Sequence, residues 1–130
     1  MISNTELLKR ITKTAERDGR YSVESFLFVI SGLEYTLGKL PQRRHLSGQE
    51  LSRGIAEYAR EQYGYLAKTV LNNWGVHATL DFGEIVYLLI HEELMNKTDE
   101  DNMDDFRNVF EFKDEFNWEK SKPRTFPERL

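Results

Sequence analysis

The sequence predicts an all-α protein: a compact single domain of about five helices. Apolar residues recur at spacings of three and four along most of the chain, and no long stretch alternates with the period of two typical of a half-buried strand. Helix-start and helix-stop signals divide the 130 residues into segments of ordinary helix length. A short C-terminal hairpin, as in a winged helix, stays open as an alternative. We expect residues 1–116 to form the domain and residues 117–130 to form an extended, poorly ordered tail.

A glycine separates the first two predicted helices. Apolar spacing predicts a helix from about Thr5 to Arg17, and Gly19 ends it because glycine adopts the left-handed conformation without strain. Ser22 is the expected N-cap of a long second helix, which Pro41 stops. Because this helix is apolar over a wide face, we expect it to be central.

A capping box marks the start of the third helix. In Ser47-Gly48-Gln49-Glu50 the serine side chain can accept from the third helical amide while the glutamate reaches back to the serine amide. The helix should run to about Tyr63, where Gly64 ends or kinks it. Residues 65–74 then read as another helical segment, with Gly75 as its stop signal.

The next predicted helix is apolar nearly all round and should be the most buried. Asp81 is its expected N-cap, in the sequence Asp81-Phe82-Gly83-Glu84. After Asn96 the pattern weakens, because residues 98–101 could cap a short helix while residues 108–112 alternate briefly like a strand. Both interpretations of this segment stay open.

Close contacts and a core are predicted from the same pattern. Gly32, Gly54 and Gly83 lie inside predicted helices, where a glycine indicates a close helix contact. The predicted core residues are Phe26, Leu27, Ile30, Leu51, Ile55, Leu66, Val70, Trp74, Ile85, Val86 and Leu89.

Charge is distributed unevenly along the chain. Residues 1–70 carry a formal charge of +3 and residues 71–130 carry −7, within a total of −4. Most of the acidity lies in residues 97–116, which would repel phosphates. Two interpretations stay open: attraction between the halves inside one domain, or a basic and an acidic surface that face different partners.

Composition excludes several classes of function. The chain has no cysteine, which excludes disulfides, thiolate nucleophiles and cysteine-ligated metal sites. Its longest fully apolar run, residues 85–90, is far shorter than the roughly 20 residues of a membrane span. We therefore expect a soluble cytoplasmic protein that does not enter a membrane.

Two sets of residues are the candidate partner-binding surfaces. The basic set lies on the predicted loop after the second helix and the start of the third: Lys39, Arg43, Arg44, His45 and Arg53. The acidic set lies near the other end of the chain: Asp99, Glu100, Asp101, Asp104 and Asp105. Guanidinium groups suit carboxylates and phosphates alike, so a protein partner is expected and RNA or the ribosome is the alternative. Sequence-specific DNA binding is disfavoured, because the acidic set would occupy the wing where phosphate contacts require cations.

A small metal-dependent enzyme is a further alternative. It would use Glu84 and His91, which lie two helical turns apart on one predicted helix. His45, His77 and His91 lack the spacings of helical zinc sites, so no catalytic residue, metal site or cofactor is predicted.

Four blocks of sequence occur in an order that resembles one family. They are residues 47–51 (SGQEL), 69–76 (TVLNNWGV), 81–86 (DFGEIV) and the acidic residues 97–101 with 105–106. Across roughly residues 21–112 they resemble a family of small uncharacterised bacterial proteins. The resemblance implies a bacterial, cytosolic protein and supplies no activity, cofactor or partner. From the residues we therefore expect a small non-enzymatic interaction or regulatory protein that binds macromolecular partners through its two oppositely charged surfaces.

Overall fold

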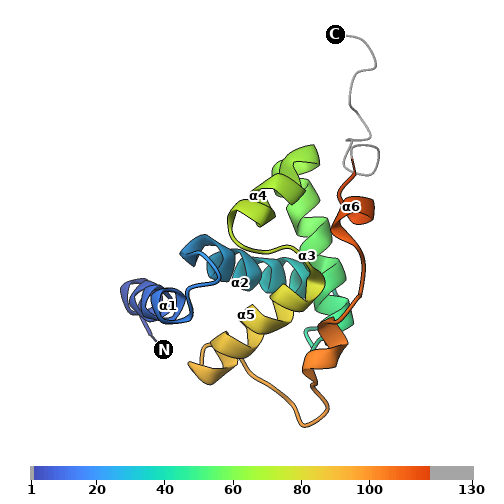
Figure 1. The fold of residues 1–130 in the computed structure, drawn as a ribbon. Coiled ribbons are helices and arrows are strands. Elements are labelled where there is room, and N and C mark those ends of the chain that lie inside the picture. Colours follow the sequence, from blue (N-terminus) through green and yellow to red (C-terminus); the bar gives the residue numbers. More distant parts are fainter. Residues whose placement is uncertain (1, 118–130) are drawn as a thin grey trace.

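The computed structural model describes residues 2–117, and over that range the protein is all-helical (Figure 1). The helices of at least seven residues are α1 (Asn4–Asp18), α2 (Val23–Gly38), α3 (Gly48–Tyr63), α4 (Ala67–Asn73) and α5 (Thr79–His91). Shorter helical turns are η1 (Gly64–Leu66), η2 (Met103–Phe106) and α6 (Phe112–Glu115). The prediction of an all-α domain of about five helices is confirmed. The predicted tail lies almost entirely outside the described residues.

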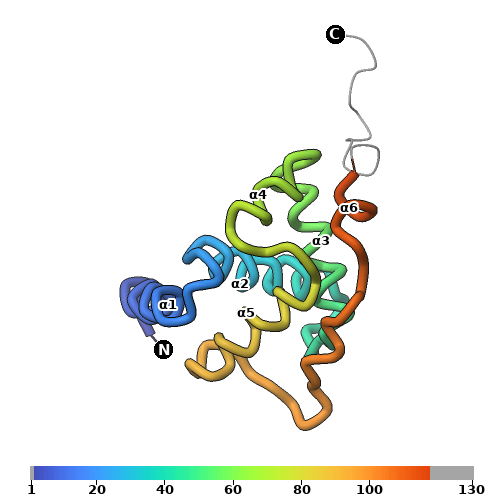
Figure 2. The backbone as a smooth tube through the Cα atoms, viewed as in Figure 1, coloured from blue at the N-terminus to red at the C-terminus, as the bar shows by residue number. Residues whose placement is uncertain are grey.

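Helix α2 is the centre of the arrangement, with α1, α3 and α5 all packed against it (Figure 1). After α5, residues 97–117 turn back and run along the outer side of α3, as the orange-to-red tube shows (Figure 2), and they are named here the return segment. Two contacts hold this return segment against α3. Arg53 donates to the carbonyl of Val109 at 3.3 Å, and Arg60 pairs with Glu115 at 2.8 Å.

Most of the predicted helix ends are confirmed. The Ser22 side chain accepts from the backbone of Ser25, and Ser47 forms both halves of its capping box. Gly19 and Gly75 have φ of 80° and 92°, the left-handed region that favours glycine. At Gly75 space also requires glycine, because an added Cβ would lie 2.2 Å from the carbonyl oxygen of Arg20.

The prediction that Asp81 is an N-cap is wrong. Helix α5 begins at Thr79, so Asp81 is the third helical residue. Its carboxylate accepts from the backbone amides of His77 and Ala78 at 2.8 and 3.1 Å, and from the Tyr21 hydroxyl at 2.5 Å. A carboxylate at the third helical position reaches back to the amide of the cap residue, as the glutamate of a capping box does. In the sequence such an acid resembles a cap, which is why the pattern placed the start too late.

The helices α2 and α3 approach closely where the sequence places glycine. A Cβ on Gly54 would lie 1.9 Å from the Thr36 hydroxyl, and one on Gly32 would lie 3.0 Å from the Ile55 side chain. These contacts confirm the prediction for both glycines.

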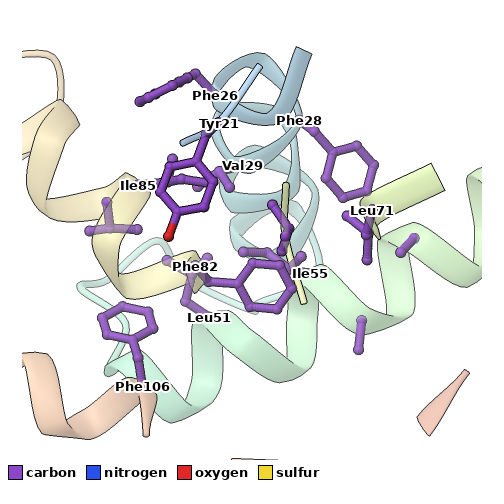
Figure 3. Close-up of a cluster of buried hydrophobic side chains, with 14 of the residues drawn as sticks. Tyr21, Phe26, Phe28, Val29, Leu51, Ile55, Leu71, Phe82, Ile85 and Phe106 are labelled. Carbon is purple, nitrogen blue, oxygen red and sulfur yellow. The ribbon is translucent and has the colours of Figure 1, made fainter. Parts of the chain in front are cut away.

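The core lies between α2, α3 and α5, where Phe82, Ile55 and Leu51 gather (Figure 3). Six of the predicted core residues are buried: Phe26, Leu51, Ile55, Ile85, Val86 and Leu89. The predictions for Leu27 and Leu66 are wrong, since these side chains are 37% and 49% exposed. Three others are half-buried: Ile30, Val70 and Trp74. On helices that are apolar nearly all round, periodicity does not identify the face that meets water.

Residues 97–117 contain no strand, so the hairpin alternative is wrong. The Thr79 hydroxyl donates to the carbonyl of Phe106 at 2.6 Å and accepts from the amide of Val109 at 3.1 Å, which occupies backbone groups that a strand would pair. The left-handed φ of 53° at Asn108 also breaks an extended run. Phe106 is buried against α3 and α5. A Cβ added to Gly48 would lie 3.0 Å from its ring, and one added to Gly83 would lie 2.7 Å from it. The close contact predicted at Gly83 is therefore confirmed.

Helix α1 lies at one edge of the domain (Figure 1). It buries Ile11 and Ala15, and two arginines tie it to the end of α5. Arg10 donates to the carbonyl of Glu92 at 3.2 Å, and Arg17 pairs with the carboxylate of the same residue at 2.8 Å.

Candidate binding site

Parts of the basic set and the acidic set meet at one pocket, named here the charged pocket. It has a volume of about 300 Å³ and lies between the C-terminal half of α2, the loop after α2, the start of α3, and α5 with the chain that follows it. Arg43, Arg44 and His45 line it from one side, and Asp101 and Asp105 from the other. Residues that are 56 positions apart in the sequence therefore share one site.

The walls of the charged pocket combine apolar and polar surface in similar measure. The aliphatic side chains that line it are Leu33, Leu37, Leu46, Leu51, Val86, Ile90, Leu94 and Met95. Leu37 and Leu46 belong to the core cluster, so these walls are part of the packed interior. The charged side chains gather in the loops that bound the pocket, and a polar rim around an apolar floor is typical of binding sites.

Each cation of the basic set has a partner. Arg43 makes two bonds to Glu34 at 3.2 and 3.3 Å, and Arg44 makes two bonds to Glu50 at 3.1 and 2.7 Å.

The other two basic-set cations lie outside the pocket. Lys39 pairs with Glu57 and lies 4.6 Å from the centre of the Tyr35 ring. Arg53 bonds to the backbone of the return segment, so neither residue lines the charged pocket.

Glu50 is held as a carboxylate by its surroundings. The hydrogen bond from the Arg44 guanidinium, followed by that from the backbone amide of Ser47, lowers the pKa of Glu50 to about 2. The start of α3 therefore carries a negative charge and a guanidinium side by side at all ordinary pH values.

His45 and Asp101 form the direct contact between the two sets. The Nε2 atom of His45 lies 2.8 and 2.9 Å from the two carboxylate oxygens of Asp101. Burial alone would raise the pKa of Asp101, but hydrogen bonds from the Thr98 amide and from His45 outweigh burial, so its pKa lies below the usual value. The pair is an ion pair when His45 is protonated and a neutral-to-charged hydrogen bond when it is not.

The rest of the acidic set is divided. Asp105 lines the charged pocket, whereas Asp104 pairs with Arg107 at 3.2 Å. Asp99 and Glu100 are exposed and do not line the pocket. The structure thus brings five of the ten predicted residues together and leaves five around them.

Sequence reasoning missed Tyr87 and Glu34, which also line the charged pocket. The Tyr87 hydroxyl is buried and has no hydrogen-bond partner among the described residues. Burial raises the pKa of Tyr87, and the charges of Asp101 and Asp105 raise it further. Both missed residues sit within long predicted helices, and no local pattern marks a helical residue as facing a cavity.

A second pocket, named here the aromatic pocket, lies on another side of α2. Its volume is about 250 Å³, and four rings line it: Phe28, Tyr58, Tyr63 and Trp74. The centre of the Phe28 ring lies 5.0, 5.9 and 5.4 Å from the centres of the other three, in that order. The two pockets have no lining residue in common.

The residues of the enzyme alternative are not assembled. Glu84 accepts from Arg20 at 3.3 Å, and His91 is exposed at the end of α5. His77 bonds to Asn72 at 3.1 Å. Within residues 2–117 no three His, Asp or Glu side chains are placed to hold a metal ion.

Comparison with other proteins adds no family to these observations. No family model, curated protein or solved structure matches the chain. Among the described residues, no helix is both long enough and apolar enough to cross a membrane.

Proposed function

We propose that this protein is a non-enzymatic, cytoplasmic interaction protein that binds a protein partner at the charged pocket. One observation carries the proposal: two segments of opposite charge, distant in sequence, meet around a cavity that aliphatic side chains partly line. Stable protein interfaces have this arrangement, with an apolar centre and a polar rim.

The size of the charged pocket suits an anchor side chain of a partner. A volume of about 300 Å³ is at the lower end for small-molecule sites and is sufficient for one large apolar or aromatic side chain. Buried anchors of this kind supply most of the binding energy in many interfaces.

The rim would orient the partner more than it would tighten binding. Arg43 and Arg44 are exposed and extend beside Glu34 and Glu50, so the rim presents both signs of charge within a few ångströms. Complementary charges of this kind raise association rates and select the correct partner, and salt screens them.

The test is the charge-reversed double variant Arg43→Glu, Arg44→Glu. Tagged wild-type protein is used to isolate partners from its native cytosol at low and high salt, followed by mass spectrometry. We expect one partner to be captured at low salt, to be released at high salt, and to be lost at least tenfold in the variant. Thermal unfolding should change little, because exposed ion pairs contribute little to stability.

The matched control reverses two exposed cations elsewhere, Lys9→Glu and Lys13→Glu on α1, with the same change in net charge. It should retain the partner. Equal loss in both variants, or capture insensitive to both, would contradict the proposal. Capture that disappears after nuclease treatment would replace the protein partner with RNA, whose binding falls steeply with salt.

A further inference from the structure

The aromatic pocket differs from the charged pocket in what lines it. Phe28, Tyr58, Tyr63 and Trp74 belong to α2, α3 and the end of α4, so three helices contribute rings to one open surface. The Tyr63 and Trp74 rings stand almost perpendicular, at 82°, with centres 5.9 Å apart. Such an arrangement can present ring faces from two directions to one ligand.

The charge of the aromatic pocket is of one sign. Glu24 is the charged residue in its lining, and no lysine, arginine or histidine accompanies it. Glu24 is exposed in the first turn of α2. The electron-rich faces of the rings and the carboxylate therefore attract positive charge together.

The same row of rings already holds a cation at its other end. Tyr35 packs against Tyr58 with ring centres 5.0 Å apart and ring planes tilted by 44°, and the ammonium group of Lys39 lies 4.6 Å from the Tyr35 ring centre. A cation attracted by a ring lies within about 6 Å of its centre. Because the lining rings are 5 to 6 Å from one another, a single cation in the aromatic pocket can be within that range of several.

We propose that the aromatic pocket binds a quaternary ammonium group carried by a small organic cation. Besides the rings, the lining offers Leu27, which is partly exposed, Ser31 and the one carboxylate of Glu24, so most of the surface of a bound cation would meet rings and aliphatic carbon. A quaternary ammonium makes no hydrogen bonds and has a methyl surface that packs on rings. This inference is independent of the proposed function, because the two pockets share no residue.

The test uses choline and its neutral isostere, 3,3-dimethylbutan-1-ol. The full chain has two tryptophans, so the variant Trp118→Phe leaves Trp74 as the one tryptophan and as a reporter inside the site. Its fluorescence is titrated with choline chloride at constant ionic strength, with sodium chloride as the balance. We expect a saturable change with choline and at least tenfold weaker binding of the neutral alcohol.

Two variants connect the signal to the site. Glu24→Gln should weaken choline binding several-fold, whereas Glu16→Gln, which neutralises an exposed carboxylate on α1, should not. Circular dichroism on the same samples verifies the fold. No saturation with choline, equal binding of the alcohol, or tighter binding of guanidinium chloride than of choline would each overturn the proposal.

Discussion

Residues 45–48 and residues 101–106 meet at two places. One contact is between charged groups at the surface and the other is between apolar groups in the interior. At the surface, the exposed side chain of His45 bonds to the mostly buried carboxylate of Asp101. Inside, Gly48 packs on the ring of Phe106, which also covers Gly83. Burying an aromatic ring contributes about 1.5–3 kcal/mol to stability, whereas an exposed ion pair contributes about 0–1 kcal/mol. The interior contact therefore contributes more to the stability of the fold than the surface contact does.

Breaking the interior contact should have the largest effect. Phe106→Ala removes a buried ring and leaves a cavity against the two glycines, so we expect a loss of about 3–5 kcal/mol in the free energy of unfolding. Urea denaturation measures it. The matched control is Phe110→Ala, at a half-buried ring of the same segment, which should lose clearly less. Equal losses would show that the contact of Phe106 with Gly48 and Gly83 has no special part in the stability of the fold.

A smaller effect is expected where the same segment is held by a hydroxyl. Thr79→Val keeps the shape of the side chain but removes the bonds to the Phe106 carbonyl and the Val109 amide, which should cost about 1–3 kcal/mol. Denaturant unfolding again measures the loss, and Thr79→Ser, which retains the hydroxyl, should recover part of it. If valine were neutral, the bonds of Thr79 would have no part in holding the return segment.

The smallest effect should come from the surface, and it should depend on pH. The hydrogen bond from Arg44 is the main cause that lowers the pKa of Glu50 from an ordinary 4.5 to about 2. The charged carboxylate therefore stabilises the folded state above pH 4.5, and this contribution disappears as the pH falls toward 2. Arg44→Ala removes the main cause. The variant should be slightly less stable than wild type near neutral pH and equally stable near pH 2.

Thermal unfolding between pH 2 and 7 measures this difference. Lys9→Ala removes a cation that has no assigned carboxylate partner and serves as the control. A stability difference between Arg44→Ala and wild type that stays constant over the whole range would contradict the assigned role of Glu50.

The contrast between the two contacts also explains what could be predicted from the sequence. Helix ends follow from local chemistry, so the capping box at Ser47 and the left-handed glycines at 19 and 75 were predicted correctly. Asp81 shows the limit of such signals, since an acid that reaches back to the cap amide from the third helical position resembles a cap in the sequence.

Contacts between distant segments have no local signal. The pairing of His45 with Asp101 requires the chain to turn back after α5, and nothing in either segment specifies the other. The return segment itself was ambiguous, because residues 108–112 alternate like a strand while their side chains pack on helices and their backbone bonds to Thr79. For the candidate site, residue types could be predicted from the sequence, but neither the cavity between them nor the part played by Tyr87 could be.

The attachment of α1 to Glu92 bears on the order in which the molecule assembles. Arg17 is synthesised 75 residues before the carboxylate it pairs with, and Arg10 precedes its carbonyl partner by 82 residues. Neither bond can form on the ribosome until α5 has emerged, and closing so long a loop is slow compared with forming the local contacts of α2 with α3. On a nascent chain, the bonds of α1 to Glu92 thus form later than the packing of α2 against α3.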